Sequence, residues 1–411
     1  MPLPSSRPLN IGLLAPACRG FNALDGGIGT YMADLAVGLA AEGHSVRVIT
    51  RAPASGAPAP EPFPGVRFVT FDSTIPRWLH HLTRWRWQAH TVASWLWRAR
   101  QAAAAVRAAH AAEPFDCIET SSSGLLPMML LRSRRRPPVI TRIATTAVQL
   151  VAHNAGASRW LDRREQRWEH DIVKRSDALL THTALHREEL IRQWNLPPSS
   201  VHLIPLGITV PADSALRESA NDRPPRVLYV GRFEHRKGVD VLLSAIPAVL
   251  ASAPGTTFDL VGHDANDYWQ QRFWRENPGI PREQVRFHGK VGATALLAAY
   301  RDCDIFVAPS RYESFGLIYV EAMAWGKPVI GCRAGGIPEV VTDGENGLLA
   351  EPGDIAGLRD ALLRLCLDPA LRTRLGGQAR RRAVERFSRE AFARASAALY
   401  SQVVSETVRQ N

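Results

Sequence analysis

Two carboxylates eight residues apart, Glu313 and Glu321, lie in the segment most able to carry chemistry, Asp304–Gly326 (DIFVAPSRYESFGLIYVEAMAWG). Its pattern predicts a strand, a short loop and a helix that begins near Ser314–Gly316, with free amides that suit an oxyanion or a sugar hydroxyl. From the helix start to Glu321 the rise is about 7–8 Å, roughly the span from a pyrophosphate to a ribose. One of the two carboxylates could therefore reach a sugar and the other a ribose diol. An isolated pair of this kind would more simply be a helix cap and a solvated side chain.

Two further loops predicted to follow strands would join this pair at one edge of a parallel sheet. In Gly231–Gly238 (GRFEHRKG), Arg232 and Lys237 would overhang the carboxyl end of a strand, where a diphosphate fits. In Gly335–Glu339 (GGIPE), the proline suits the first turn of a helix. Each loop alone is more simply a turn, but three loops at one sheet edge favour a binding site.

A glycine-rich loop in the first half, Gly26–Tyr31 (GGIGTY), precedes a predicted helix. It resembles a dinucleotide-binding fingerprint only superficially, because Met32 stands at the third glycine position. The next strand also ends in Thr50 and Arg51, without an acidic residue for a ribose hydroxyl. These departures disfavour a nicotinamide enzyme. We expect the amides of this loop to close over a phosphate held by the opposing domain.

Strand patterns alternate with longer helical stretches, which predicts an α/β fold of parallel sheets with crossover helices. We expect two such domains, residues 1–208 and 209–388, that face each other across a cleft. A C-terminal helix, residues 389–411, would cross back to the first domain. Ligands of open α/β sheets bind beyond the carboxyl ends of the strands, where these motifs lie. The strands expected are Asn10–Pro16, Ser45–Thr50, Phe115–Glu119, Val139–Ile143, Arg226–Gly231, Thr257–Gly262, Val285–Gly289, Asp304–Pro309 and Pro328–Cys332.

With these motifs the chain resembles the retaining glycosyltransferases of the GT-B fold, in the large family four typified by glycogen synthase and bacterial mannosyltransferases. The resemblance extends from GGIGTY through GRFEHRKG and APSRYESFGLIYVEAMAWGKPVI to GGIPEVVTDGENGLL. It implies two Rossmann-like domains, the first for the acceptor and the second for a nucleotide diphosphate sugar (UDP or GDP). It also implies neither a metal nor another cofactor, because cations and helix dipoles neutralise the leaving group.

The same resemblance implies a role for each residue that matches the family pattern. Arg232 and Lys237 would bind the donor diphosphate and assist its departure. Glu321 would bind the donor ribose, and Glu313 the donor sugar. The remaining donor-side positions are Val291 beside the base and the amides of Gly29, Phe315, Gly316 and Leu317.

One position departs from the family pattern. Relatives usually carry a His that touches the donor sugar after the strand that matches Val139–Ile143, and this chain has Ala144 there, followed by Thr145. The missing imidazole puts the identity of the sugar in doubt. We predict altered donor use, and a catalytically silent module is the alternative.

Arginines and tryptophans interleave in Arg77–Arg100, which is predicted as one helix with an apolar stripe and with Trp87 and Arg98 opposite it. Such a pattern suits a membrane interface, a sugar-stacking acceptor groove or single-stranded nucleic acid. A surface helix packed by its tryptophans is an equally good interpretation.

Composition limits the classes of protein that remain. No apolar run reaches the ~18 residues that a membrane span needs, and the N-terminus does not resemble an export signal. Five scattered cysteines argue against a disulfide framework and a structural zinc site. These features predict a cytoplasmic protein, peripheral to the inner membrane if it meets lipid.

The net charge of +11 resides mainly in residues 1–210, which hold 24 basic and 15 acidic residues. An acidic small substrate or an anionic membrane surface would suit this excess, and so would a solvated surface in an arginine-rich proteome. Charge alone would motivate a nucleic-acid partner, and we expect none.

The sequence therefore predicts a metal-independent, hexosyl-type retaining glycosyltransferase of bacterial glycan or natural-product biosynthesis. Its acceptor would be a small molecule, a glycan or a lipid-linked compound. The alternatives are a silent GT-B module that binds glycan or membrane, and a nucleotide-sugar epimerase or a phosphorylase of the same architecture.

Overall fold

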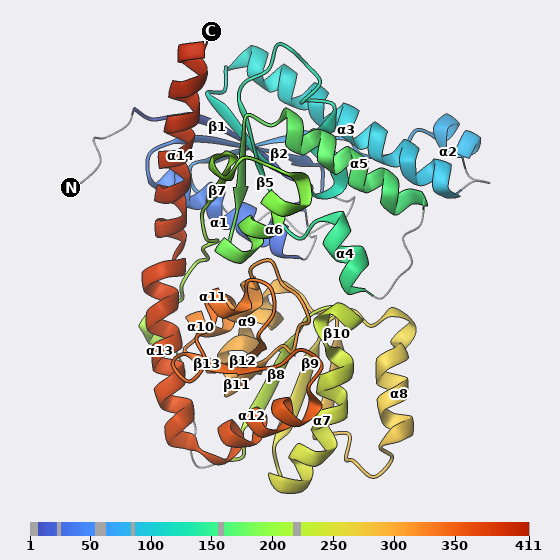
Figure 1. Cartoon of the computed structure of the whole chain (residues 1–411), viewed down its shortest axis with the longest axis vertical. Helices are drawn as coiled ribbons and strands as arrows, with labels where there is room; N and C mark the ends of the chain where they lie inside the picture. Colours follow the sequence, from blue (N-terminus) through green and yellow to red (C-terminus); the bar gives the residue numbers. More distant parts are fainter. Residues whose placement is uncertain are drawn as a thin grey trace.

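Two parallel β-sheets, each covered by helices, follow one another along the long axis of the molecule (Figure 1). The computed structural model describes residues 7–22, 26–53, 63–83, 87–154, 160–216 and 223–410. This arrangement confirms the predicted α/β class with two Rossmann-like domains.

The first sheet has the strand order β3-β2-β1-β4-β5-β6-β7. Its central strands are buried on both faces, as expected for apolar, β-branched segments between two helical layers. The strands are β1 (Asn10–Leu14), β2 (Ser45–Arg51), β3 (Val66–Phe71), β4 (Cys117–Ser121), β5 (Val139–Arg142), β6 (Ala178–Thr181) and β7 (Val201–Leu203).

The second sheet has the strand order β10-β9-β8-β11-β12-β13. Its first strand in the chain, β8, lies beside β11, which lies beside β12. Because these strands are parallel, the loops that follow them begin side by side at the carboxyl edge of the sheet. The strands are β8 (Arg226–Val230), β9 (Thr257–Val261), β10 (Val285–Gly289), β11 (Ile305–Val307), β12 (Val329–Cys332) and β13 (Gly347–Ala350).

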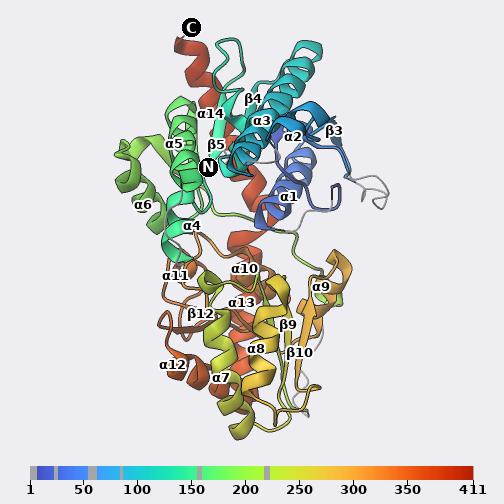
Figure 2. The ribbon, with the colours of Figure 1, turned by 90° about the vertical axis from the view of Figure 1, so that its right-hand side faces the viewer.

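Helices cover both faces of each sheet (Figures 1 and 2). Those of the first half are α1 (Gly27–Ala41), α2 (Arg77–Thr83), α3 (Trp87–Ala112), α4 (Ala147–His153), α5 (Trp160–Arg175) and α6 (Ala184–Trp194), with the 3₁₀ turn η1 (Ser123–Met128). Those of the second half are α7 (Val239–Ser252), α8 (Tyr268–Glu276), α9 (Ala293–Asp302), α10 (Leu317–Ala324), α11 (Ile337–Val340), α12 (Ile355–Leu367), α13 (Pro369–Phe387) and α14 (Arg389–Gln410), with the 3₁₀ turn η4 (His235–Lys237).

The C-terminal helix α14 returns to the first half and packs along α1, as the sequence predicts. A Cβ added to Gly38 of α1 would lie 2.8 Å from Ala393 Cβ, so the missing side chain allows the close approach of the two helices. At the start of this return, Ile208 and Ser388 form an isolated bridge. Residues 208 and 388 remain the proposed ends of the first and the second domain.

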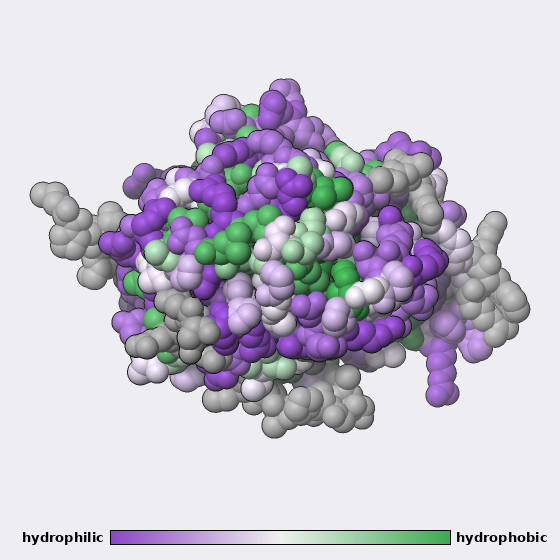
Figure 3. All heavy atoms as spheres, turned by 90° about the horizontal axis from the view of Figure 1, so that it is seen from below, coloured by the Kyte–Doolittle hydropathy of each residue, from purple (hydrophilic) through white to green (hydrophobic). Residues whose placement is uncertain are grey.

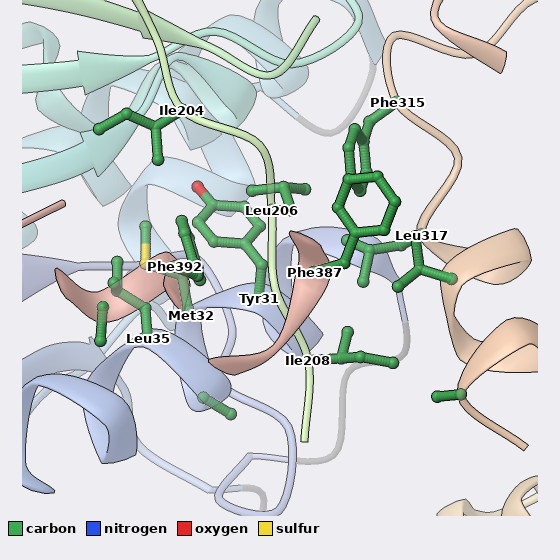
Figure 4. Close-up of a cluster of buried hydrophobic side chains, with 14 of the residues drawn as sticks. Tyr31, Met32, Leu35, Ile204, Leu206, Ile208, Phe315, Leu317, Phe387 and Phe392 are labelled. Atoms are coloured by element: carbon green, nitrogen blue, oxygen red, sulfur yellow. The ribbon is translucent and has the colours of Figure 1, made fainter. Parts of the chain in front are cut away.

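Apolar side chains fill the junction between the two halves (Figure 4). Tyr31 of α1 lies beside the segment that leads to the second half, and Phe315 and Leu317 approach from the loop before α10 and from its first turn. The same cluster includes Met32, Leu35, Ile204, Leu206, Ile208, Phe387 and Phe392. One continuous core therefore joins the two halves. By contrast, the end of the molecule below the second sheet is largely hydrophilic, with apolar side chains near its centre (Figure 3).

The prediction of one helix over Arg77–Arg100 is wrong. The imidazole rings of His80 and His90 lie 5.1 Å apart, whereas ten residues of a continuous helix would separate them by about 15 Å. Helix α2 therefore folds back on α3, and Thr83 Oγ1 lies 2.8 Å from His90 Nδ1. The predicted apolar stripe is not buried as a unit, because Trp78 and Leu82 are exposed.

Candidate functional site

Glu313 lies buried in the loop between β11 and α10, surrounded by polar side chains from two loops. Its Oε1 accepts hydrogen bonds from Lys237 Nζ and, at 3.1 Å, from Ser310 Oγ. Its Oε2 lies 3.4 Å from Arg236 Nη1, which also donates to the Tyr312 carbonyl at 3.0 Å. The carboxylate is therefore held in one orientation by two cations and a hydroxyl.

The charges of this cluster shift the pKa values of its members. Burial alone would raise the pKa of Glu313, but the cations of Lys237 and Arg236 outweigh it and hold the pKa below its usual range. Burial lowers the pKa of Lys237, although the Glu313 carboxylate opposes that shift. Lys237 and Glu313 therefore form a largely buried ion pair, in which each charge stabilises the other.

The loop after β8 carries the other cations. Arg232 is exposed and lies 3.1 Å from Glu234, which also pairs with Arg236 at 2.9 Å. Arg311 fixes this loop on α7, because its guanidinium donates two 2.7 Å bonds to Asp240 and one to the His235 carbonyl. Arg232 is therefore the cation of this loop that can turn toward a ligand without breaking a buried contact.

Two glycines bring the remaining loops against Glu313. Gly316 has φ 92°, and a Cβ there would lie 2.6 Å from the Tyr319 ring, so α10 begins only at the following residue. Gly335 has φ 53°, and its Cβ would lie 2.3 Å from the Glu313 carbonyl oxygen. The next amide, Gly336 N–H, donates to that oxygen at 2.7 Å. The third predicted loop thus lies directly on the Glu313 loop.

Glu321 projects from α10 toward the first half of the chain. The Tyr300 hydroxyl of α9 donates to its Oε2 at 2.8 Å. Burial raises the pKa of Glu321, and the Tyr300 hydrogen bond and the charge of Arg19 oppose the shift. Arg19, which lies between β1 and α1 of the first half, is thus near enough for its charge to act on Glu321.

The N-termini of α1 and α10 approach each other across the junction. A Cβ added to Gly27 would lie 3.9 Å from Leu317 Cδ1. Neither helix has a side-chain cap, so the amides of their first turns, those of Gly29 and Leu317 included, lack that partner. Val291, between β10 and α9, packs on the edge of the junction core. Two uncapped helix ends near one point can bind an anion.

Thr145, the residue after the half-buried Ala144, contacts the same loop from the first half. Thr145 Oγ1 donates to Ser314 Oγ at 3.3 Å, and Thr183 Oγ1 donates to the Ser314 carbonyl at 2.9 Å. Nearby, the His153 ring of α4 stacks on Tyr312 with centroids 4.4 Å apart. The position of the absent imidazole therefore adjoins the loop that carries Glu313.

Of the residues predicted for the donor side, the structure joins Lys237 to Glu313 and brings the start of α1 close to Leu317 at the junction of the two halves. Arg232 lies in the loop of Lys237, Glu321 lies on the helix of Leu317, and Val291 packs against the junction core. The structure does not bring Trp87 there, because this side chain is 58% exposed at the start of α3, near the outer edge of the first domain (Figure 1). Sequence reasoning missed Arg236, Ser310 and Tyr300. Arg236 had a signal, its place beside Lys237 in the same basic loop, whereas Tyr300 had none.

Within the described ranges no group of three or more His, Cys, Asp or Glu side chains could hold a metal ion. A search of the helices over the same residues finds none long and apolar enough to cross a membrane.

Two family models match the chain. Residues 26–207 match the glycosyl transferase 4-like domain, and residues 224–368 match the glycosyl transferases group 1. A D-inositol 3-phosphate glycosyltransferase of Saccharomonospora viridis is 30% identical over 385 residues, which cover 88% of this chain and 86% of that protein.

Solved structures share the fold. The sucrose-phosphate synthase of Thermosynechococcus elongatus has a TM-score of 0.76 and 27% identity, over 96% of this chain and 99% of that one. The Anabaena Alr3699/HepE protein, solved in complex with UDP-glucose, has a TM-score of 0.67 and 20% identity, over 98% of this chain and all of that one.

Proposed function

This chain is a glycosyltransferase of the group 1 family, and we propose that it moves a sugar from a nucleotide diphosphate to an acceptor with retention of the anomeric configuration. The observation that carries the proposal is the meeting of three strand-end loops and two uncapped helix N-termini at the junction of the two halves. Such a site matches the anionic, hydroxyl-rich chemistry of a nucleotide sugar.

The donor diphosphate binds at Arg232 and Lys237, together with the amides that begin α1 and α10. Arg232 is exposed and can turn toward a phosphate, and the amides of Gly29 and Leu317 belong to helix ends that favour negative charge. Glu321 accepts hydrogen bonds from the ribose hydroxyls, and Val291 packs beside the base. The HepE protein, which is 20% identical and was solved in complex with UDP-glucose, supports this donor class.

Glu313 holds the donor sugar, with the amides of Phe315 and Gly316. Its depressed pKa keeps the carboxylate ionised, so it accepts hydrogen bonds from sugar hydroxyls and does not donate a proton. Ser310 and Arg236 fix its orientation, which limits the sugar geometries that it accepts.

Departure of the nucleotide diphosphate is the step that these charges assist. Negative charge grows on the leaving phosphate as the glycosidic bond breaks, and Arg232, Lys237 and the helix ends stabilise it where it forms. The cations of this chain thus stabilise the leaving group, a role that a metal ion plays in other transferases.

The acceptor approaches from the first domain, on the side of Ala144 and Thr145. The Thr145 contact with Ser314 links that surface to the loop that carries Glu313. A small molecule, a glycan or a lipid-linked compound suits this position.

Thermal unfolding and turnover with UDP-, GDP- and ADP-sugars test the proposal. A specific donor should raise the melting temperature, because it binds only the folded state. Analysis of the anomeric configuration of the product by NMR then tests retention. An inverted product would refute the stereochemical proposal, and the absence of stabilisation or turnover by every nucleotide sugar would refute the donor class.

A further inference from the structure

An apolar groove runs along α3 in the first domain, away from the junction site. It has a volume of about 390 Å³. Six of its eight lining residues are apolar: Leu79 of α2; Ala93, Leu96, Trp97 and Ala103 of α3; and Met129, which follows η1. The other two, Arg100 and Arg107, are exposed arginines of α3. The groove thus joins an apolar wall to two cations.

The segment that supplies most of the groove carries charge of one sign only. Residues 77–112 contain six arginines and five tryptophans, and no aspartate or glutamate. Among the described residues neither Arg100 nor Arg107 forms an ion pair, whereas the next acidic residue, Glu113, pairs with Arg67 at 2.8 Å. Two unpaired cations beside an apolar wall fit a ligand with an apolar chain and an anionic head.

Exposed apolar side chains gather beside the groove. Helix α2 and the first residues of α3 and α5 lie at one outer edge of the first domain (Figures 1 and 2). We call their exposed side chains the tryptophan edge: Trp78 (59% exposed), Leu82 (74%), Trp87 (58%) and Trp160 (44%). Tryptophan at the surface of a water-soluble domain is costly, and its amphipathic ring is at home at the headgroup level of a bilayer.

We propose that this region docks on an anionic lipid bilayer, with one lipid seated in the α3 groove. The chain of that lipid lies along Leu96, Ala103 and Met129, and its phosphate meets Arg100 and Arg107. The tryptophan edge enters the headgroup layer around it. This binding is independent of the transferase chemistry, because it uses none of the junction residues.

Co-sedimentation with lipid vesicles tests the proposal. The protein should bind vesicles of phosphatidylcholine mixed with phosphatidylglycerol, should not bind phosphatidylcholine alone, and should be released by salt. The double variant Arg100→Gln/Arg107→Gln should weaken this binding by about thirtyfold, since each cation near an anionic surface contributes about 1 kcal/mol. The matched control is Arg134→Gln/Arg135→Gln, which removes two exposed cations from another loop of the same domain. Equal losses in the two double variants would overturn the groove, and equal binding to neutral vesicles would overturn the anionic lipid.

A second variant separates lipid from nucleic acid. Leu82→Ser removes an exposed apolar side chain that can enter a bilayer but cannot stack on a base. It should lower vesicle binding severalfold and leave the binding of a single-stranded oligonucleotide unchanged. If the oligonucleotide binds as tightly as the anionic vesicles and Leu82→Ser affects neither, the site is a general polyanion surface and the proposal fails. The nucleotide-induced thermal shift, measured without vesicles, verifies that each variant folds, so that a failure here is distinct from a failure of the transferase proposal.

Discussion

At the scale of single residues, the Glu313 carboxylate is the centre of the proposed site. Lys237, Arg236 and Ser310 contact its two oxygens. Arg232 is linked to this cluster through Glu234, which pairs with both Arg232 and Arg236. In this state Lys237 is engaged by Glu313, so a bound diphosphate would share the ammonium with the carboxylate. In the proposed mechanism the Lys237 cation would therefore couple the leaving group to Glu313, the residue proposed to hold the sugar.

Removal of either proposed phosphate-binding cation should slow turnover. Lys237→Ala and Arg232→Ala should each cost about 1.5–3 kcal/mol, the scale of a charge-assisted hydrogen bond, and much of the loss should lie in kcat because charge grows in the transition state. Steady-state kinetics measure this. Arg359→Ala, which removes an exposed arginine paired with Asp360, is the control. Turnover in the two test variants equal to that of the control would exclude their assigned role.

Substitution of Glu313 and of Glu321 should weaken the binding of different ligands. Glu321→Gln should weaken the binding of the free nucleotide diphosphate, because it removes the acceptor for the ribose. Glu313→Gln should weaken the intact donor more than the free nucleotide, because its partner is the sugar. Calorimetry with both ligands measures the difference. Identical effects of both substitutions on both ligands would contradict the division of roles.

At the scale of elements, close backbone contacts and a buried carboxylate hold the loops around the proposed site in place. Gly335 lies against the Glu313 carbonyl, which fixes the loop after β12. In the first domain, Glu169 of α5 accepts bonds from Ser122 Oγ at 3.0 Å and from Ala147 N–H, at the start of α4, at 2.9 Å. These contacts hold the segments that bear Glu313 and Thr145.

Gly335→Ala should disrupt the site more than an equally strained glycine elsewhere. The new Cβ would lie 2.3 Å from the Glu313 carbonyl oxygen, so the loop must move. Gly344, with φ 74° and no atom within 4 Å of its added Cβ, is the matched control. Both substitutions incur a left-handed backbone cost of about 1–2 kcal/mol. We expect donor affinity to fall strongly in Gly335→Ala only, as measured by the thermal shift with the donor; equal shifts in both variants would contradict this.

Glu169 should make the stability of the protein depend on pH. Burial raises its pKa to about 7, although the Ala147 amide and the Ser122 hydroxyl oppose the shift. The folded state thus binds this proton more tightly than the unfolded state, whose carboxyl has a pKa of about 4.3. Its contribution to the free energy of unfolding therefore falls as pH rises from about 4.3 to about 7, and is constant above.

Urea unfolding at several pH values between 5 and 8, roughly the range that this titration covers, tests the effect. Glu169→Gln should flatten the decline, because the amide does not titrate. Glu385→Gln, on the exposed face of α13, should keep the wild-type slope. A slope in Glu169→Gln as steep as that of wild type would show that other groups cause the decline.

At the scale of the whole molecule, the site exists only where the two halves meet. Thr145 and Thr183 contact Ser314, and the Glu339 carboxylate accepts from the Ala184 and Leu185 amides that begin α6, at 2.8 and 2.9 Å. Helix α14 returns along α1 and adds to the apolar junction. The loops proposed for the donor and the side proposed for the acceptor are thus held together by both polar contacts and a shared core.

Ala144 is the position at which this junction should decide donor choice. Ala144→His should lower turnover of the preferred donor, because the imidazole would crowd the half-buried space beside Thr145 and Ser314. It should raise turnover of a common hexose donor by roughly two- to tenfold, the worth of one hydrogen bond. Ala144→Ser keeps the space open and should retain the wild-type preference. A wild-type protein inactive with every donor, together with activity in Ala144→His alone, would favour a silent module.

The sequence by itself determined the two parallel sheets, the return of α14 and the loops that carry Glu313, Lys237 and Arg232. The sheets and the loops follow from local patterns, because consecutive residues specify each strand and parallel strands bring the loops after them to one edge. The return of α14 is a long-range feature, and the resemblance to the GT-B family indicated it. Only the tertiary structure decided which side chains within those loops meet. Arg236, within the turn η4, donates to Glu313, and Tyr300 reaches Glu321 because α9 packs on α10. Helix α2 folds back on α3, which leaves Trp87 at an outer edge. Such contacts join residues distant in the chain, and their distances are set by packing that no local pattern encodes.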